Sequence, residues 1–429
     1  MSSRAASSRP RTAKIGLAMA GGGPAGAVYE IGALYALEEA VEGLPINDLD
    51  IYVGVSAGAF IGASLVNGLT PTQMVRAIVK QGPGEHPFVP ETFLTPSFRE
   101  VGKRLASIPG LLAQAIAGYA RHPQDALLGQ TLAKLGQALP VGLFDNEPIR
   151  HYLEKIYNLK GRTDDFRKLR RPLVVVAADL DAGTAVRFGS EGWDHVPISR
   201  AVQASTALPG LYSPVEIEGR SYVDGALLRT LHASVALEAG VELLICLNPI
   251  VPIDTTGAIE AGQLTTGKLV ERGLPAVLSQ SLRTLIRSRL DVGLSSYRRR
   301  FNADIVLFEP LRRDYKMFFT NIFGFSDRQV VCEHAYQATR KDLLSRYQEL
   351  APAFARHGLK LRRDVLEDPS RDLWVGVGLP HLSRRRHSTL DVVTRLDRAL
   401  ARLEEWVDDP SEDEAEGEPS RPSLRLVKG

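Results

Sequence analysis

Short apolar runs alternate with helical patterns along most of the chain, and this alternation predicts the fold class. The strand-like runs lie at residues 14–20, 50–55, 172–178, 242–247 and 303–308. Helical patterns over residues 27–42 and 57–67 follow the first two runs. Strands that alternate with helices in this way predict an α/β fold, with a mainly parallel central sheet and helices on both faces.

Two pairs of short strands predict hairpins in addition to the parallel strands. Residues 185–189 can return along 172–178 through a turn at 181–183, and 215–217 can pair with 220–223. A Gly, which favours tight turns, stands between the two strands of each pair. We therefore expect antiparallel pairing at both places.

One long segment, residues 81–140, does not follow the alternation. It is rich in Pro and Gly and contains an apolar helical stretch at 111–119. Two interpretations stay open: a lid-like insertion over a site, or a packed helical excursion with no moving part.

A basic helix is predicted over residues 275–300. Its apolar positions fall on one predicted face, at Leu282, Leu285, Ile286, Leu290 and Leu294. Its charge comes from Arg283, Arg287, Arg289, Arg298, Arg299 and Arg300. The pattern suits a helix that lies on an anionic membrane surface, and equally a core helix with a solvated basic face.

The two ends of the chain differ in composition from the middle. Residues 1–13 are rich in Ser and Arg, and we predict a disordered leader there. Residues 404–418 contain nine acidic residues and no basic ones, so we predict a disordered acidic tail over 404–429. No apolar run suits a secretory signal or reaches the length of a membrane span. We therefore expect a cytoplasmic protein, in contact with a membrane only peripherally at its inner face.

Charge and cysteine content exclude several classes of protein. A net charge of +2 in 429 residues does not indicate a nucleic-acid partner. The two cysteines, Cys246 and Cys332, cannot form a disulfide framework, and no Cys or His cluster has the spacing of metal ligands. Cys246 lies in an apolar run, so we expect a buried free thiol and no bound metal.

The first candidate motif is the glycine-rich loop Gly21-Gly22-Gly23-Pro24-Ala25-Gly26, between a predicted strand and a helix. Glycines let backbone amides point into a cavity, and a helix N-terminus favours negative charge. The loop suits either a dinucleotide pyrophosphate or the oxyanion of an acyl-transfer intermediate.

The second motif, Gly54-Val55-Ser56-Ala57-Gly58, also lies between a strand and a helix. This is the context of a nucleophile elbow, in which a sharp turn exposes the serine hydroxyl. A dinucleotide site would instead need an acidic residue at the end of this strand, where Ser56 stands. The third motif, Asp224-Gly225-Ala226, follows another strand and offers a base for the serine, although Asp-Gly is also common in plain turns.

In this order, the three motifs resemble the patatin-like phospholipase family. Similar segments surround them, at residues 26–34, 142–149, 178–183 and 204–210. The resemblance extends over about residues 15–311. It implies a patatin-like catalytic domain at 14–311 with the insertion at 81–140, and a C-terminal helical extension at 312–403.

The resemblance also implies the site and its reaction. The family assigns the oxyanion hole to the loop glycines Gly21, Gly22, Gly23 and Gly26. Ser56 is then the nucleophile in an elbow built by Gly54 and Gly58, and Asp224, in a motif with Gly225 and Ala226, is its base. No His, metal or cofactor is needed.

The implied activity is hydrolysis of acyl esters in lipids, either phospholipid, lysophospholipid or acylglycerol, by a Ser-Asp dyad. Asp224 takes the proton of Ser56, whose oxygen attacks the ester carbonyl, while the amides of Gly22, Gly23 and Ala57 hold the oxyanion. Water activated by Asp224 then releases the fatty acid, whereas another alcohol as acceptor would give acyl transfer. The expected partner is a lipid or membrane surface.

Two positions depart from the family pattern. A basic residue is usual where Ala25 stands, and an Asn followed by a Pro is usual near residues 229–232, where this chain has Arg-Thr-Leu-His. The first departure removes a positive charge near the oxyanion loop, and the second alters packing near Asp224.

Three other interpretations stay open. One is an α/β-hydrolase whose triad is completed by His232, His334 or His357, although that fold places several strands before the nucleophile. Another is a flavin or nicotinamide protein that uses the loop 21–26. The third is a family member that binds lipid without catalysis.

Overall fold

The structure is a computed structural model that describes residues 13–79, 95–97, 102, 106–110, 140–260, 268–314 and 325–378. Contacts divide the chain into a unit of residues 1–380 and a unit of residues 381–429, which lies outside the described residues. Nearly all of the predicted leader and insertion, and the whole acidic tail, also lie outside them. Those predictions and the domain boundaries therefore stay predictions.

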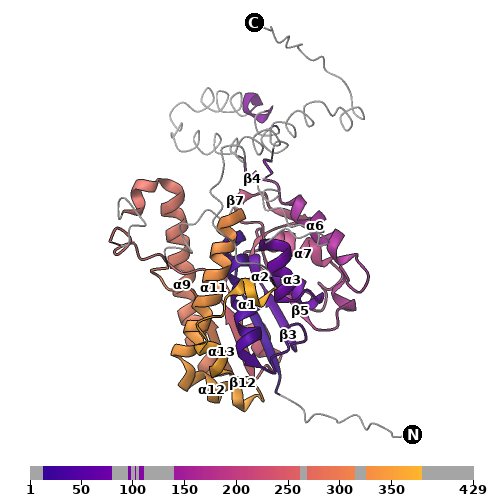
Figure 1. The fold of residues 1–429 in the computed structure, drawn as a ribbon. Helices are drawn as coiled ribbons and strands as arrows, with labels where there is room; N and C mark the ends of the chain where they lie inside the picture. The colour runs from indigo at the N-terminus through magenta and orange to yellow at the C-terminus, as the bar shows by residue number, and fades with distance from the viewer. Residues whose placement is uncertain are drawn as a thin grey trace, which may run out of the picture. The chain divides into compact units, whose positions relative to one another are not determined.

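One sheet of eight strands forms the centre of the first unit (Figure 1). Its parallel part consists of β11 (Asp304–Phe308), β10 (Leu243–Leu247), β1 (Ile15–Met19), β3 (Ile51–Gly54) and β5 (Leu173–Asp179), in this order. These are the five strands predicted from the apolar runs, within one or two residues at most ends. The mainly parallel α/β sheet is thus confirmed.

Both predicted hairpins are present at the side of β5. The strand β6 (Thr184–Phe188) pairs with β5, and β8 (Val215–Ile217) pairs with β9 (Arg220–Asp224), each antiparallel. The turn between β8 and β9 has positive φ at both central residues, 52° at Glu218 and 73° at Gly219. This geometry matches the twist of a two-residue hairpin. Strand β9 also pairs with β5, which brings Asp224 opposite Ala177.

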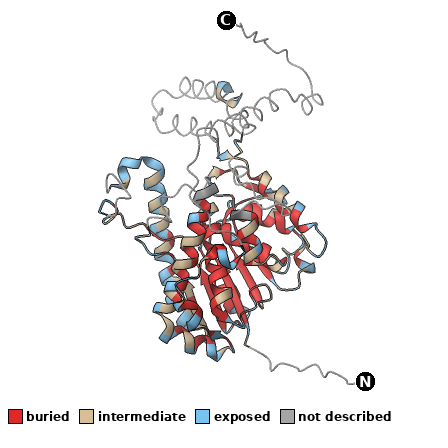
Figure 2. Cartoon of the chain, viewed as in Figure 1, coloured by how far each residue is buried: buried red, intermediate tan, exposed pale blue. Residues whose placement is uncertain are grey.

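Helices cover both faces of the sheet, as predicted. Leu17 and Met19 of β1 belong to one buried cluster, with α1 (Gly23–Ala40), α2 (Ala57–Val66) and α11 (Phe325–Ser345). Ala18 belongs to a second cluster, with α8 (Ser234–Glu238) and α9 (Leu274–Arg300). The strands between the two clusters are buried nearly throughout (Figure 2).

The first helix, α1, is buried around most of its circumference because α11 covers the side that faces away from the sheet (Figure 1). A Cβ at Gly32 would lie 2.4 Å from the carbonyl oxygen of Cys332, so the two helices touch at their backbones. The Tyr336 hydroxyl donates to Glu39 at 2.5 Å in the same interface. Cys332 and Cys246 are both buried free thiols, which confirms the expectation for Cys246.

The basic helix α9 differs from its prediction in one position. Ile286, Leu290 and Leu294 are buried as expected, but Leu285 is 60% exposed. Successive residues lie about 100° apart around a helix, so Leu285 points away from the buried side. Leu278 and Val292, seven residues before and after Leu285, are also exposed.

The remaining elements are short or lie beside the main sheet. They are β2 (Val41–Glu42), α3 (Pro71–Met74), β4 (Gly142–Phe144), α6 (Glu147–Tyr157), α7 (Ile198–Ser205), β7 (Gly210–Tyr212), α12 (Tyr347–Arg356), β12 (Lys360–Leu361), α13 (Arg363–Glu367) and α14 (Leu373–Gly376). Single turns of tighter or wider helix occur at Val75–Val79, Phe166–Lys168, Gly225–Leu227 and Leu269–Arg272. None of the helices that the structure describes combines the length and apolar character needed to cross a bilayer.

Candidate active site

Ser56 occupies a strained turn between β3 and α2. Its φ of 54° and ψ of −121° lie outside the common regions for a residue with a side chain. Such a conformation costs about 1–3 kcal/mol and persists only where the surrounding structure enforces it. Gly54 and Gly58 supply the space for this turn. A Cβ at Gly54 would lie 2.5 Å from the first turn of α2, and a Cβ at Gly58 would lie 2.5 Å from the backbone of Met19. This is the geometry of the predicted nucleophile elbow.

A buried serine on α7 holds the turn in place. The Ser56 amide donates to the Ser205 hydroxyl oxygen at 2.8 Å, and the Ser205 hydroxyl donates to the carbonyl of Val176 on β5 at 2.6 Å. Ser205 has no exposed surface. The segment 204–210 resembles the family in sequence, but no spacing rule links Ser205 to Ser56, so the sequence alone does not predict this role.

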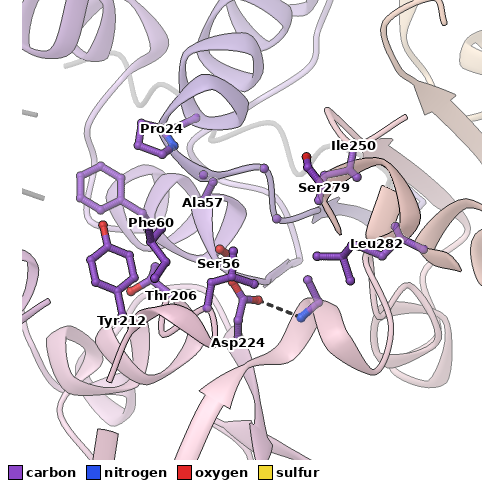
Figure 3. Close-up of a pocket in the computed structure, with 18 of the residues that line it drawn as sticks. Pro24, Ser56, Ala57, Phe60, Thr206, Tyr212, Asp224, Ile250, Ser279 and Leu282 are labelled. Carbon is purple, nitrogen blue, oxygen red and sulfur yellow. Dashed lines mark hydrogen bonds between the residues drawn. The ribbon is translucent and has the colours of Figure 1, made fainter. Parts of the chain in front are cut away.

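Asp224 stands at the end of β9 and faces the nucleophile (Figure 3). Its carboxylate accepts a hydrogen bond from the Ala226 amide at 2.9 Å, and Ser56 lies beside it in the same pocket. The side chain is 3% exposed, and this burial raises the pKa of Asp224 to about 6, against the lowering effects of Ser56 and of the Ala226 amide. A carboxylate with a pKa near 6 is poised to exchange a proton at neutral pH.

The glycine loop passes directly beside the serine. A Cβ at Gly21 would lie 3.1 Å from the Cβ of Ser56, and one at Gly22 would lie 2.6 Å from Pro249. A larger residue at Gly21 would press on Ser56, and one at Gly22 would clash with Pro249 and with the backbone of Gly26. Gly21, Gly22 and Gly23 all line the pocket above the nucleophile.

Three backbone amides at this site remain available to a ligand. Within the described part of the chain, the amides of Gly22, Gly23 and Ala57 donate to no protein acceptor, and all three residues line the pocket. Gly26 differs from the other predicted loop glycines. Its amide donates to the carbonyl of Gly22 at 3.0 Å, because it belongs to the first turn of α1, and it is not part of the pocket wall.

The third motif also requires small residues. A Cβ at Gly225 would lie 2.4 Å from the carbonyl oxygen of Val176, so the turn after Asp224 packs tightly on β5. Ala226 donates its amide to Asp224 and lines the pocket. Both residues of the motif thus fix the position of the carboxylate.

Ser56 and Asp224 open into a pocket of about 240 Å³ with a mainly apolar wall. Figure 3 shows Phe60, Thr206 and Tyr212 on one side of Ser56, and Ile250, Ser279 and Leu282 on the other. The second side belongs to α9 and the loop after β10. The remaining wall residues are Pro24, Ala27, Val28, Ile149, Leu208, Leu211, Leu227, Arg283, Ile286 and Arg328.

No histidine of the described residues lines this pocket. The Nε2 of His232 lies 3.4 Å from the Gly225 carbonyl oxygen, and burial lowers the pKa of its imidazole to about 4. His334 and His357 pair with Asp314 and Asp304, each at 2.7 Å. The three histidines considered for a triad therefore lie outside the pocket.

The two departures from the family pattern leave Ser56 and Asp224 together in the pocket wall. Ala25 is partly buried and packs against the core, so the loop brings no cation to the pocket. Thr230, Leu231 and His232 are all buried beneath the third motif. Among the described residues, no group of three or more His, Cys, Asp or Glu side chains is arranged to hold a metal ion.

Comparisons with solved structures give low similarity. VipD from Legionella pneumophila is 17% identical with a TM-score of 0.38, over 78% of this chain and 67% of that chain. The type III effector ExoU, known from Pseudomonas aeruginosa, is 14% identical with a TM-score of 0.33, over 79% of this chain and 54% of that one. Both TM-scores are below 0.5, so the family assignment rests on sequence.

Among curated proteins, uncharacterized NTE family proteins of Mycobacterium tuberculosis and Mycobacterium bovis are 34% identical over 77 residues. That alignment covers 18% of this chain and 20% of each relative, so the chain spans about a fifth of their length. A family model described as "Patatin-like phospholipase" matches residues 17–237, which include Ser56, Asp224 and the glycine loop. This match extends over more than half of the chain, which therefore belongs to the patatin-like phospholipase family.

Proposed function

We propose that the protein is a serine acyl hydrolase that cleaves acyl esters of lipids with Ser56 as nucleophile and Asp224 as base. Membership of the family supports lipid hydrolysis in general. The observation that supports the dyad is the position of Ser56 beside the buried Asp224 carboxylate, in a pocket whose described wall contains no histidine (Figure 3).

In the first half of the reaction, Asp224 accepts the proton of Ser56 while the serine oxygen attacks the ester carbonyl carbon. Collapse of the tetrahedral intermediate expels the alcohol, which takes the proton back from Asp224. The acyl group is now bonded to Ser56. In the second half, Asp224 removes a proton from water, and the hydroxide attacks the acyl-enzyme. The fatty acid is released as Asp224 returns that proton to the Ser56 oxygen.

The negative charge of each tetrahedral intermediate needs donors that are already in place. The amides of Gly22, Gly23 and Ala57 line the pocket next to Ser56 and have no acceptor within the described protein. We assign the oxyanion hole to them. Donors of this kind typically contribute about 10²–10³-fold each in rate, because they need no reorganisation as the charge develops.

The apolar wall supports a substrate with a hydrocarbon chain. Phe60 and Tyr212 stand on one side of the nucleophile, where an acyl chain would be buried (Figure 3). Water as the acceptor makes the reaction a hydrolysis, and an alcohol in its place would make it an acyl transfer.

Contact with a membrane surface follows from the proposed substrate. The helix α9 lines the pocket with Ser279 and Leu282, and it also exposes Leu274, Leu278 and Leu285 beside this wall. It contains six arginines and one acidic residue, Asp291. Exposed leucines together with arginines suit the boundary between anionic head groups and acyl chains. We therefore propose a peripheral contact through α9.

The test is hydrolysis of a p-nitrophenyl acyl ester and of phosphatidylcholine vesicles by the wild type and two variants, Ser56→Ala and Asp224→Asn. Both variants should fold and should lose about 10⁴-fold or more in kcat/KM, because the dyad acts as a unit. Asp224→Asn is nearly isosteric, so its thermal unfolding should match the wild type.

An active Asp224→Asn variant would instead make Asp224 structural. In that case, Ala substitutions of His232, His334 and His357 would show whether one of them serves as the base. A wild type that is inert on every ester would favour lipid binding without catalysis, or a flavin or nicotinamide bound at the loop 21–26.

A further inference from the structure

The pocket in front of the nucleophile is more closed on one side than on the other (Figure 3). Phe60 and Tyr212 stand on the first side, and both are buried. On the second side, Ile250 and Leu282 are half-buried and Ser279 is exposed. We call these the closed side and the open side. A substrate chain therefore meets a wall sooner on the closed side.

A stacked pair of aromatic rings backs the closed side. Phe60 lies one turn of α2 after Ser56, and its amide donates to the Ser56 carbonyl at 3.2 Å. Its ring stacks on Tyr152 of α6, with ring centroids 6.2 Å apart and 13° between the planes. Ile149, on the same face of α6 as Tyr152, is buried and also lines the pocket. The Phe60 ring can therefore move back only if α6 moves with it.

Buried polar contacts hold α6 in its place. The Asn146 amide group donates to the Gln203 carbonyl of α7 at 3.2 Å, and the Gln203 side chain donates to Asn146 Oδ1 at 3.0 Å. Both side chains are buried, so breaking these bonds would leave polar groups without partners. In the first turn of α6, Glu147 pairs with Arg150 and with Arg200 of α7. The closed side is thus rigid.

The volume of the pocket limits the length of chain that it can hold. The whole pocket has a volume of about 240 Å³. A cavity of about 150 Å³ takes one benzene molecule, which corresponds to about 25 Å³ per carbon atom, so the pocket holds about ten carbon atoms. This volume includes both sides of the nucleophile, so the closed side alone holds fewer. A longer chain must leave the pocket or push against Phe60.

The order of the reaction determines which part of an ester belongs on each side. While the acyl group is bonded to Ser56, the alcohol has to leave and water has to reach the same carbonyl carbon. Both the alcohol and the water need an open path, whereas the acyl chain stays where it is. The acyl chain therefore fits the closed side, and the alcohol fits the open side.

We propose that Phe60, backed by Tyr152, sets an upper limit on the length of the acyl chain that the enzyme cleaves efficiently. The limit is about eight to ten carbon atoms, from the volume of the pocket. The alcohol part of the ester has no such limit. This inference rests on the proposed acyl hydrolase function and names its substrate class, which is medium-chain acyl esters with alcohols of any length.

Two isomeric esters provide the test. Octyl hexadecanoate and hexadecyl octanoate have the same composition and the same two chains, but they exchange which chain is the acyl group. Both are offered together in the same detergent micelles, so differences in solubility and surface binding are minimised. The ratio of octanoate to hexadecanoate released, measured by mass spectrometry, gives the ratio of the two kcat/KM values. This ratio cancels any general loss of activity.

The wild type should favour hexadecyl octanoate by about 10-fold or more, because extra methylenes overfill a rigid site. Phe60→Ala should lower this preference by about 10-fold, since it removes the ring that ends the closed side. Phe60→Leu retains more of the buried volume and should fold as the wild type does, with a smaller change in the same direction. Phe354→Leu, a matched change of a buried ring on α12 outside the pocket, should leave the ratio unchanged.

Equal cleavage of the two isomers by the wild type would overturn the length limit and leave the hydrolase function intact. A preference for octyl hexadecanoate that Phe60→Ala abolishes would place the alcohol on the closed side and overturn the assignment. A wild-type preference that stays unchanged in both folded Phe60 variants would overturn the role of Phe60.

Binding of fatty acids to Ser56→Ala does not depend on turnover. Octanoate and hexadecanoate are titrated by calorimetry below their micelle concentrations. The limit is supported, even if the proposed hydrolysis fails, when hexadecanoate binds no more tightly than octanoate and the added change Phe60→Ala tightens only hexadecanoate. An affinity that rises by about fourfold per methylene up to hexadecanoate, the gain expected for unrestricted burial, would overturn it.

Discussion

The family-matched residues 17–237 and the helices that follow them contribute different things to the same pocket. The first region supplies Ser56, Asp224 and the free amides, and close backbone contacts leave no room for a side chain at Gly58 or Gly225. The second region, through α9 and α11, supplies wall residues and two cations held by side chains. Backbone packing thus positions Ser56 and Asp224, whereas side chains of the later helices shape the wall that contacts a substrate.

The largest effect should come from adding a side chain at Gly58, in the tightly packed turn that holds Ser56. Gly58→Val places its side chain against the backbone of Met19, where even a Cβ would lie 2.5 Å away. We expect a loss of about 3 kcal/mol or more in the free energy of unfolding and no measurable ester hydrolysis, because a clash with backbone cannot be relieved by a rotamer change. Thermal unfolding measures the loss of stability, and a p-nitrophenyl ester assay measures the loss of hydrolysis.

The control is Gly68→Val, which tests backbone strain alone. Nothing lies within 4 Å of a Cβ at Gly68, but its φ is +84°. Equal effects at both sites would contradict the packing argument.

The rate of ester hydrolysis should depend on pH through the protonation of Asp224. Asp224 must be ionised to accept the proton of Ser56, and burial raises its pKa to about 6. As the pH falls below this value, kcat/KM should fall about tenfold per unit, because the protonated carboxyl cannot act as a base. A pH profile on a soluble neutral ester measures this, with circular dichroism to confirm folding. An inflection at the ordinary Asp value near 4 would contradict the burial effect.

Removal of the Ser205 hydroxyl tests positioning within the first region. Ser205→Ala deletes the acceptor for the Ser56 amide and should lower kcat by about tenfold on every substrate, with little change in KM. Ser199→Ala, on the same helix and away from the pocket, is the matched control. A change confined to one lipid class would be inconsistent with a role in holding the nucleophile.

The smallest effect should come from the second region. Leu285→Ser changes an exposed residue of α9, so folding and hydrolysis of a soluble ester should stay at wild-type levels. Hydrolysis of anionic vesicles should fall about threefold, because less apolar area enters the lipid. Val375→Ser, at a similarly exposed position of α14, should change neither rate. Equal vesicle hydrolysis by the wild type, Leu285→Ser and Val375→Ser would contradict a membrane contact through α9.

The sequence was sufficient for the parts of the fold that depend on local pattern. The five parallel strands, both hairpins and the helices after each glycine motif follow from apolar runs and turn residues. The site was found through motifs, and the pairing of Ser56 with Asp224 came from the family resemblance, because no local rule links residues 168 positions apart.

The hydrophobic pattern does not determine which helices and strands pack against one another. Leu285 and Ile286 are both apolar, but the packing of α9 buries only the second. The hydrogen bond from Ser56 to Ser205 depends on how α7 sits beside β5. Arg328 reaches the pocket only because α11 crosses α1, and helical periodicity does not say which helices meet.

The packing of α11 on α1 has a consequence for synthesis of the protein. Translation proceeds from the N-terminus, so the glycine loop and α1 leave the ribosome long before α11 exists, about 300 residues later. Strand β1 likewise has no β10 to pair with until that later strand has been synthesised. The nucleophile elbow is therefore synthesised early, but the pocket around it can close only after α11 has been made. Before that point, the pocket lacks the part of its wall that α9 and α11 contribute.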